Sequence, residues 1–155
     1  MIQREQLMQE LVHDPYKVIG KPPEPSTCTD CGAIFRDGRW TWAAAQPGSG
    51  HAICPACKRV REKLPAGFVT LRGEFFGAHR EEVLSRVRHC EEAEKRDHPL
   101  QRIMAIQADG EGTMVTTTDP HLARRIGDAL HKAFKGKLEF HYNKGEDLLR
   151  VQWER

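Results

Sequence analysis

The chain has 155 residues, and its 24 Lys and Arg against 22 Asp and Glu give a formal net charge of +2 at pH 7. Hydrophobic residues make up 39% and charged residues 30%, which excludes a disordered chain and favours a soluble globular protein. No stretch approaches the roughly 18 apolar residues of a membrane span, and no apolar signal segment starts the chain, so we expect a cytoplasmic protein without membrane contact.

The first 25 residues predict a short helix followed by a linker. Leu7, Met8 and Leu11 have helical spacing among polar residues, although a helix over 1–12 is too short to be stable alone. Three prolines between positions 22 and 25 impose an extended linker. We therefore expect a helix and linker at 1–25, a cysteine module at 26–65 and a C-terminal domain at 66–155.

The cysteine module contains two Cys-x-x-Cys pairs, Cys28/Cys31 and Cys54/Cys57, separated by 22 residues. Two intervening residues let both sulfurs of a pair face one point, and four thiolates suit tetrahedral Zn²⁺ better than other common ions. The gap is slightly longer than the usual range for paired-cysteine zinc sites. The sequence predicts one structural zinc ion held by these four residues, with no open position for a catalytic water.

Other cysteine chemistries agree less well with this pattern. A lone Cys-Pro-x-Cys would resemble a thioredoxin-like redox motif, but the second pair favours a metal site. The chain has five cysteines, which is an odd number, and we find no signal segment. Both observations disfavour disulfides. A zinc deaminase needs His-x-Glu before its cysteine pair, whereas the sequence His-Arg-Glu at 79–81 comes after both pairs.

The residues between and after the cysteine pairs predict a hairpin and a helix. Asp37-Gly38 is a strong hairpin signal between the strands expected at 33–36 and 39–42. Residues 57–64 predict a short helix that Pro65 ends. A cysteine knuckle, a hairpin and a helix in this order are typical of a treble clef, and without the helix they form a zinc ribbon. We expect a treble-clef-like or zinc-ribbon module.

From residue 66 onward, the sequence predicts alternating strands and helices. Strands are expected at 68–76, 103–106, 113–118, 138–142 and 149–153. A helix over 79–95 places Cys90 on its apolar face, so we interpret Cys90 as a small core residue and not as a fifth ligand. Asp119-Pro120 begins a second helix that Gly136 closes.

This order is β-α-β-β-α-β with one added strand. It predicts an α+β fold with a ferredoxin-like split βαβ domain and an extra C-terminal strand. Two helices would cover one sheet face and leave the other free for solvent or a partner. The strands at 103–106 and 113–118 carry no aromatic residue, which disfavours an RNA-recognition domain. No phosphate-binding loop or nucleophile elbow is present, so we expect a protein without catalytic activity.

Basic and aromatic residues in the cysteine module are candidates for RNA binding, because arginine pairs with phosphate and tryptophan stacks on unpaired bases. Four thiolates and one Zn²⁺ would together bring the formal charge from +2 to zero, so only local patches can attract RNA. Alternatively, Lys58 and Arg59 only offset the thiolate charge, and the tryptophans close a small core. The candidates are Arg36, Arg39, Trp40, Trp42, Lys58, Arg59, Arg61 and Lys63.

Several motifs carry a family resemblance: Cys-x-x-Cys-Gly at 28–32, Ile-Cys-Pro-x-Cys-Lys-Arg at 53–59, Gly-x-Val-x-Leu-x-Gly at 67–73 and His-Pro-Leu-x-Arg-Ile at 98–103. Together they resemble a family of small bacterial four-cysteine zinc proteins. That family is similar to the N-terminal zinc region of the nonsense-mediated-decay-type export adaptor of the large ribosomal subunit. The resemblance implies zinc at the four paired cysteines and a role at the ribosome. The chain is far shorter than the adaptor, so export is not implied.

We therefore expect a non-catalytic, zinc-stabilised accessory factor that binds structured RNA or the ribosome. Two alternatives stay open. One is a protein-interaction or regulatory zinc module that docks a protein partner through the open sheet face or the N-terminal helix. The other is a thiol-based redox or zinc sensor.

Overall fold

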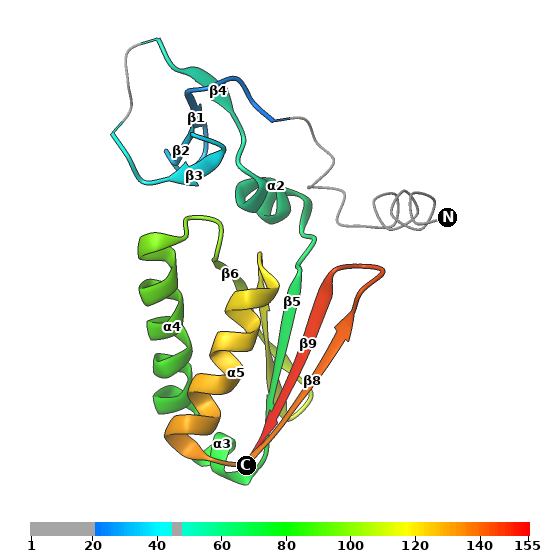
Figure 1. The fold of residues 1–155 in the computed structure, drawn as a ribbon. Coiled ribbons are helices and arrows are strands. Elements are labelled where there is room, and N and C mark those ends of the chain that lie inside the picture. Colours follow the sequence, from blue (N-terminus) through cyan, green and yellow to red (C-terminus); the bar gives the residue numbers. More distant parts are fainter. Residues whose placement is uncertain (1–20, 45–47) are drawn as a thin grey trace.

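The computed structural model describes residues 21–44 and 48–155. The helix expected within 1–12 lies outside these residues. Figure 1 shows the cysteine module, which carries a small sheet and one helix, next to the C-terminal domain, which carries a larger sheet and three helices. Within the described ranges, no helix combines the length and the apolar character that crossing a membrane requires. The fold is thus α+β, as expected, with two separate mixed sheets.

The small sheet has the strand order β3-β2-β1-β4. Its strands are β1 (Ser26–Cys28), β2 (Ile34–Arg36), β3 (Arg39–Thr41) and β4 (Gly50–Ala52). Strands β2 and β3 form the expected hairpin, and Asp37 and Gly38 at its turn both have positive φ, 53° and 76°. Strand β1 pairs antiparallel with β2 and parallel with β4. Neither β1 nor β4 was expected, because three residues are too few to show an alternating pattern.

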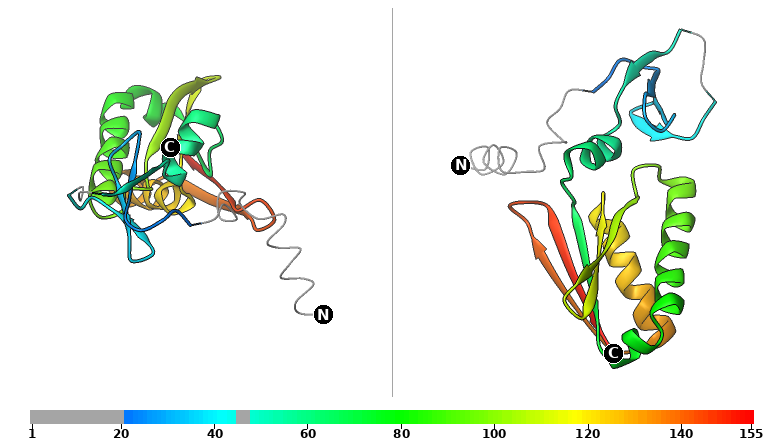
Figure 2. Two further views of the ribbon diagram at one scale, coloured as in Figure 1. Left: turned by 90° about the horizontal axis from the view of Figure 1, so that it is seen from above. Right: turned by 180° about the vertical axis from the view of Figure 1, so that it is seen from behind.

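Helix α2 (Pro55–Glu62) follows β4. It lies between the small sheet and the C-terminal domain in Figure 1 and in the right-hand view of Figure 2. It begins two residues before the expected start because Cys54 acts as its N-cap and Pro55 occupies the first turn. Lys63 ends it with a left-handed backbone at φ 55°. This position brings the second cysteine pair to the start of a helix.

The larger sheet has the strand order β6-β7-β5-β9-β8. Its strands are β5 (Gly67–Arg72), β6 (Ile103–Asp109), β7 (Gly112–Thr117), β8 (Lys137–Asn143) and β9 (Leu148–Glu154). Strands β5 and β9 are parallel, and the other neighbouring pairs are antiparallel. In a ferredoxin-like sheet, the strand after the second helix pairs with the first strand. Here the added strand β9 lies between them, so it is a central strand and not an extra edge.

Helices α4 (Arg80–Asp97) and α5 (Pro120–Phe134) cover the same face of this sheet (Figure 1). Their apolar sides and the inward side chains of the strands form the main core, in which Cys90 is partly buried, as expected. The strand expected at 68–76 ends early at Gly73, whose φ of 108° favours glycine, and the short helix α3 (Glu74–Ala78) follows. A side chain at Gly73 would also collide with the backbone of Arg155.

The core of the C-terminal domain gives a first testable prediction. Ile126 is fully buried on α5 within the main cluster, so Ile126→Ala removes buried methylene groups and leaves a cavity. We expect the free energy of unfolding to fall by about 2–5 kcal/mol in urea titration. Asp128→Ala, at an exposed position on the same helix, is the control and should change it by about 0.5 kcal/mol or less. Equal effects of both substitutions would contradict this packing.

Candidate metal centre

Four cysteine side chains converge where the small sheet meets α2. Their sulfur atoms all lie within 4.8 Å of one another, and the Sγ atoms of Cys31 and Cys54 are 3.8 Å apart. Tetrahedral ligands at a metal–sulfur distance of about 2.3 Å lie about 3.8 Å from one another. Cys28, Cys54 and Cys57 are buried, and Cys31 is partly exposed. The four cysteines expected from the sequence therefore lie together and can hold one metal ion.

The first pair sits in a tight turn after β1. The N–H of Cys28 donates to the carbonyl of Ala33 at 2.7 Å, and the N–H of Gly32 donates to the carbonyl of Cys28 at 3.0 Å. Gly32 has a φ of 80°, which a residue with a side chain adopts only at a cost. The glycine after the pair thus closes the turn that points Cys28 and Cys31 to the same side.

The second pair is positioned by the start of α2. The N–H of Cys57 donates to Sγ of Cys54 at 3.3 Å, and the N–H of Cys54 donates to Sγ of Cys28 at 3.2 Å. These N–H groups and the positive end of the helix partly offset the charge of the thiolates. The second bond also joins the two pairs directly.

Burial and hydrogen bonds shift the acidity of the thiols in opposite directions. Burial raises the pKa of Cys54 and of Cys57 above the ordinary value of a thiol. At Cys28, burial also raises the pKa, but backbone N–H groups, led by that of Cys54, lower it more, and the result is a pKa of about 7. Cys28 therefore ionises readily near neutral pH, as a metal ligand must.

A guanidinium group from the C-terminal domain contacts the cluster. Arg102 donates from Nη1 to Sγ of Cys57 at 3.1 Å, and from Nη2 to Sγ of Cys54 at 3.1 Å and of Cys31 at 3.2 Å. Burial lowers the pKa of Arg102, but the contacts with these sulfurs raise it more, so the group stays charged. A metal ion with four thiolates is anionic, and Arg102 supplies a positive charge beside it.

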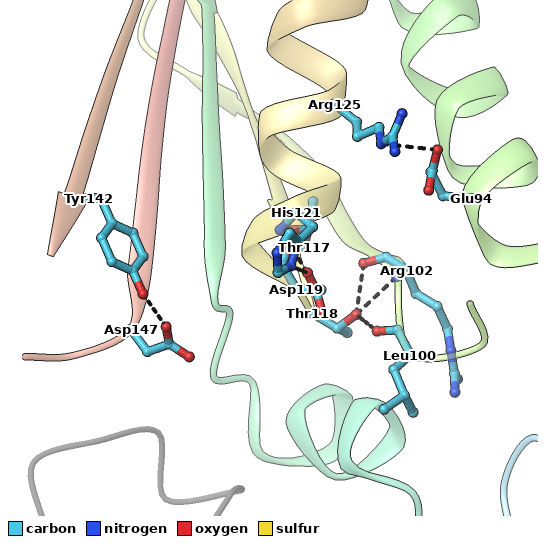
Figure 3. Close-up of polar contacts among 10 residues, drawn as sticks. All are labelled: Glu94, Leu100, Arg102, Thr117, Thr118, Asp119, His121, Arg125, Tyr142 and Asp147. Carbon is cyan, nitrogen blue, oxygen red and sulfur yellow. Dashed lines mark hydrogen bonds and ion pairs between the residues drawn. The ribbon is translucent and has the colours of Figure 1, made fainter. Parts of the chain in front are cut away.

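The backbone around Arg102 is fixed by Thr118 (Figure 3). The N–H of Arg102 donates to the Thr118 hydroxyl at 2.9 Å, and that hydroxyl donates to the carbonyl of Leu100 at 2.6 Å. Nε of Arg102 donates to the carbonyl of Pro99 at 2.8 Å. The side chain of Leu100 packs against the cysteine cluster. Residues 99–102 therefore connect the metal centre to the C-terminal domain.

Sequence reasoning missed Arg102 as part of the site. It lies 45 residues after Cys57 and has no fixed spacing from either cysteine pair. The one sequence signal is its place in the segment His-Pro-Leu-x-Arg-Ile, where a basic residue directly precedes an apolar strand. That signal does not reveal the contact, because only the packing of the two domains brings Arg102 to the sulfurs.

The predicted RNA-binding residues on the hairpin occupy different environments. Arg36 and Arg39 are exposed. Trp40 is partly buried and contacts Phe35, with ring centroids 5.3 Å apart. Trp42 is 39% exposed, and its indole N–H donates to the carbonyl of Lys95 at 2.7 Å. Trp42 therefore forms a second link to the C-terminal domain.

The four predicted basic residues on and after α2 also differ. Arg59 is buried, and its guanidinium group donates to the carbonyl of Leu64 at 2.9 Å. This bond ties the segment after α2 to the helix and stabilises the end of the helix. Arg61 forms an ion pair with Asp30. Lys58 lies 4.0 Å from Glu62, and Lys63 is exposed. The eight candidates therefore do not all lie on the protein surface. Arg59 is buried, whereas Arg36, Arg39, Arg61 and Lys63 are exposed.

The fold and the site define an α+β protein with a four-cysteine cluster suited to a metal ion. In comparisons with known proteins, the chain matches no protein-family model, no curated protein and no solved structure. The comparisons therefore identify no relationship to the export adaptor. The function has to be inferred from the geometry of the site and its surroundings.

Proposed function

We propose that the protein is a zinc-stabilised accessory factor that binds RNA or the ribosome and has no catalytic activity. Four sulfur donors in a compact, buried cluster favour Zn²⁺ among the common metal ions and fill its tetrahedral coordination. The start of α2 at the second cysteine pair supports the treble-clef-like interpretation over the zinc ribbon. For the C-terminal domain, we propose a variant of the ferredoxin-like plan in which β9 is inserted between β5 and β8.

The observation that carries RNA binding is the register of the β2–β3 hairpin. Arg36 lies directly opposite Arg39 in this antiparallel pair, and both side chains are exposed. Directly opposed like charges destabilise a sheet, so this placement costs stability unless an anion lies between or beside the two groups. The phosphates of RNA are such anions, and guanidinium groups bind them through paired hydrogen bonds.

The opposed arginines give the second prediction. We expect the double variant Arg36→Glu and Arg39→Glu to bind single-stranded RNA much more weakly than the unmodified protein in fluorescence anisotropy. The slope of log affinity against log salt should fall by about one for each phosphate contact that is lost. Arg86→Glu with Arg88→Glu, at exposed positions on α4, is the matched control and should keep the affinity. Unchanged affinity in the hairpin variant would contradict the role of Arg36 and Arg39.

The ribosome is tested separately, because RNA binding in solution does not establish it. Cell extract is fractionated on a sucrose gradient at low and high salt. We expect the protein to sediment with ribosomal particles at low salt and to leave them at high salt, since phosphate contacts weaken as salt rises. A protein that stays at the top of the gradient at low salt contradicts the ribosome part of the proposal.

The contacts around the sulfurs favour a structural role over the sensor alternative. A thiol sensor needs exposed, nucleophilic sulfur. Here Cys28 and Cys54 are 1% and 0% exposed, and the partly exposed Cys31 accepts a hydrogen bond from Arg102, as do Cys54 and Cys57. Burial hinders the approach of an oxidant, and hydrogen bonds lower the electron density on sulfur. Both effects support slow oxidation.

A further inference from the structure

A cavity of about 400 Å³ lies on the cysteine module beside the metal centre. Its wall is mainly apolar and includes the aromatic rings of Phe35 and Trp40 and the side chain of Ile53. Trp40 and Ile53 also pack against the cysteine cluster, so one wall of the cavity is fixed by the metal centre. Cavities of roughly 300–1,000 Å³ with apolar walls are typical of sites for small ligands or parts of larger ones.

Charged groups at the cavity favour an anionic ligand. Lys21 and Lys58 are part of its lining, with Nζ of Lys58 4.0 Å from a carboxylate oxygen of Glu62, and the described residues that line the cavity include no acidic side chain. The nearby carboxylate of Glu24 accepts a hydrogen bond from the N–H of Gly38 at 2.8 Å. Pro55, the first residue of α2, also lies in the wall. A ligand with a flat apolar part and an adjoining negative charge matches this combination.

We propose that this cavity binds one unstacked base of a single-stranded RNA, with a flanking phosphate at Lys21 and Lys58. The inference rests on the proposed function, because it names how the same module engages RNA. Gly38 lies at the turn between the two opposed arginines and also lines the cavity. The phosphates bound by the hairpin and the base bound by the cavity therefore belong to neighbouring nucleotides. Stacking on an aromatic ring is sequence-tolerant, so every base can enter.

The test compares two labelled RNA hexamers on the full, zinc-loaded chain: one with six bases and one that is abasic at every position. Fluorescence anisotropy should show binding of the base-containing hexamer that is tighter by roughly 5- to 150-fold, the range expected for one stacked base. Equal affinities overturn the cavity proposal but leave phosphate binding, and hence the proposed function, in place. If neither hexamer binds, both proposals fail.

A cavity-filling variant provides an independent readout. Ala52 lines the cavity, so Ala52→Phe should remove the preference for the base-containing hexamer and leave binding of the abasic hexamer unchanged. Ala43→Phe, at an exposed position outside the lining, should keep the preference. Zinc content reports whether each variant folds. A preference that survives in a folded Ala52→Phe variant contradicts the proposal.

The three tryptophans allow the site to be located without any substitution. The indole N–H groups of Trp42 and Trp153 donate to the carbonyls of Lys95 and Lys135, each at 2.7 Å. Trp40 alone among the three lines the cavity. In ¹⁵N–¹H NMR spectra, the base-containing hexamer should shift the indole signal of Trp40 and leave that of Trp153 in place. An unmoved Trp40 signal at saturation overturns the proposal.

Discussion

Removing the metal, or replacing Cys54 by serine, should unfold the cysteine module and leave the C-terminal domain folded. The buried cluster of the module consists of Cys28, Cys54 and Cys57 with two alanines, and only a few partly buried side chains pack against it. Such a core contributes little hydrophobic free energy by itself. A structural zinc ion contributes about 10–16 kcal/mol of folding free energy in isolated zinc fingers. The small core of the module cannot replace this free energy when the metal is lost.

The C-terminal domain responds differently because its core is larger and contains no metal ligand. Its buried cluster joins helices α3, α4 and α5 to the central strands β5, β7 and β9. After treatment with a strong chelator, we expect the indole NMR signals of Trp40 and Trp42 to collapse to the position of an unfolded chain. The signal of Trp153, which is buried in the C-terminal core, should stay. Far-ultraviolet circular dichroism should keep the signal of the two long helices.

Cys90→Ser is the matched control for Cys54→Ser. Cys90 lies on α4, outside the four-sulfur cluster, and is half-buried against the main core. This substitution should lower the stability of the C-terminal domain slightly and leave the metal content unchanged. A single transition in which Trp40 and Trp153 lose their native signals together would contradict independent folding of the C-terminal domain. A native Trp40 signal after complete metal loss would contradict the role of the metal.

The parts of the fold that follow from local rules agreed with the sequence. The turn at Asp37-Gly38 formed the expected hairpin, and Asp119 caps α5 by accepting from the N–H of His121 at 2.7 Å. Each cysteine pair is likewise built by a short local turn, in which the N–H of Gly32 donates to the carbonyl of Cys28 and the N–H of Cys57 donates to Sγ of Cys54. In each case, the residues that determine the structure are within a few positions of one another.

The parts that depend on distant contacts could not be read from the sequence. Strands β1 and β4 are parallel partners with 21 residues between them, and each is three residues long. The insertion of β9 beside β5 joins the two ends of the C-terminal domain. Neither pairing leaves a local pattern, because a three-residue strand shows no period and an alternating strand pairs equally well at an edge or at the centre.

Arg102 is the clearest of these distant contacts, and Arg102→Met should weaken metal binding and loosen the contact between the two domains. Methionine keeps much of the side-chain length but removes three hydrogen bonds to sulfur and the positive charge. Substitution of groups around a metal site typically lowers metal affinity about 10- to 100-fold. We expect a loss in this range when zinc is competed with a chelating dye.

Two controls separate the charge of Arg102 from its geometry. Arg102→Lys keeps the charge but has one nitrogen where the guanidinium uses two, so it should recover only part of the affinity. Arg88→Met removes an exposed arginine from α4 and should leave zinc affinity unchanged. Zinc affinity that is equal in Arg102→Met and Arg88→Met would contradict a role for Arg102 in stabilising the anionic centre.

The effect on the domain contact has its own readout in Trp42. Its indole N–H donates to the carbonyl of Lys95 across the two domains, and Arg102 makes the other polar link through its three hydrogen bonds to cysteine sulfurs. Without the Arg102 contacts, only the Trp42 hydrogen bond remains of these two polar links between the domains. The Trp42 signal should therefore shift in zinc-saturated Arg102→Met, whereas the Trp40 signal keeps its native position. If both signals stay unchanged at full zinc occupancy, Arg102 serves the metal alone and does not hold the domains together.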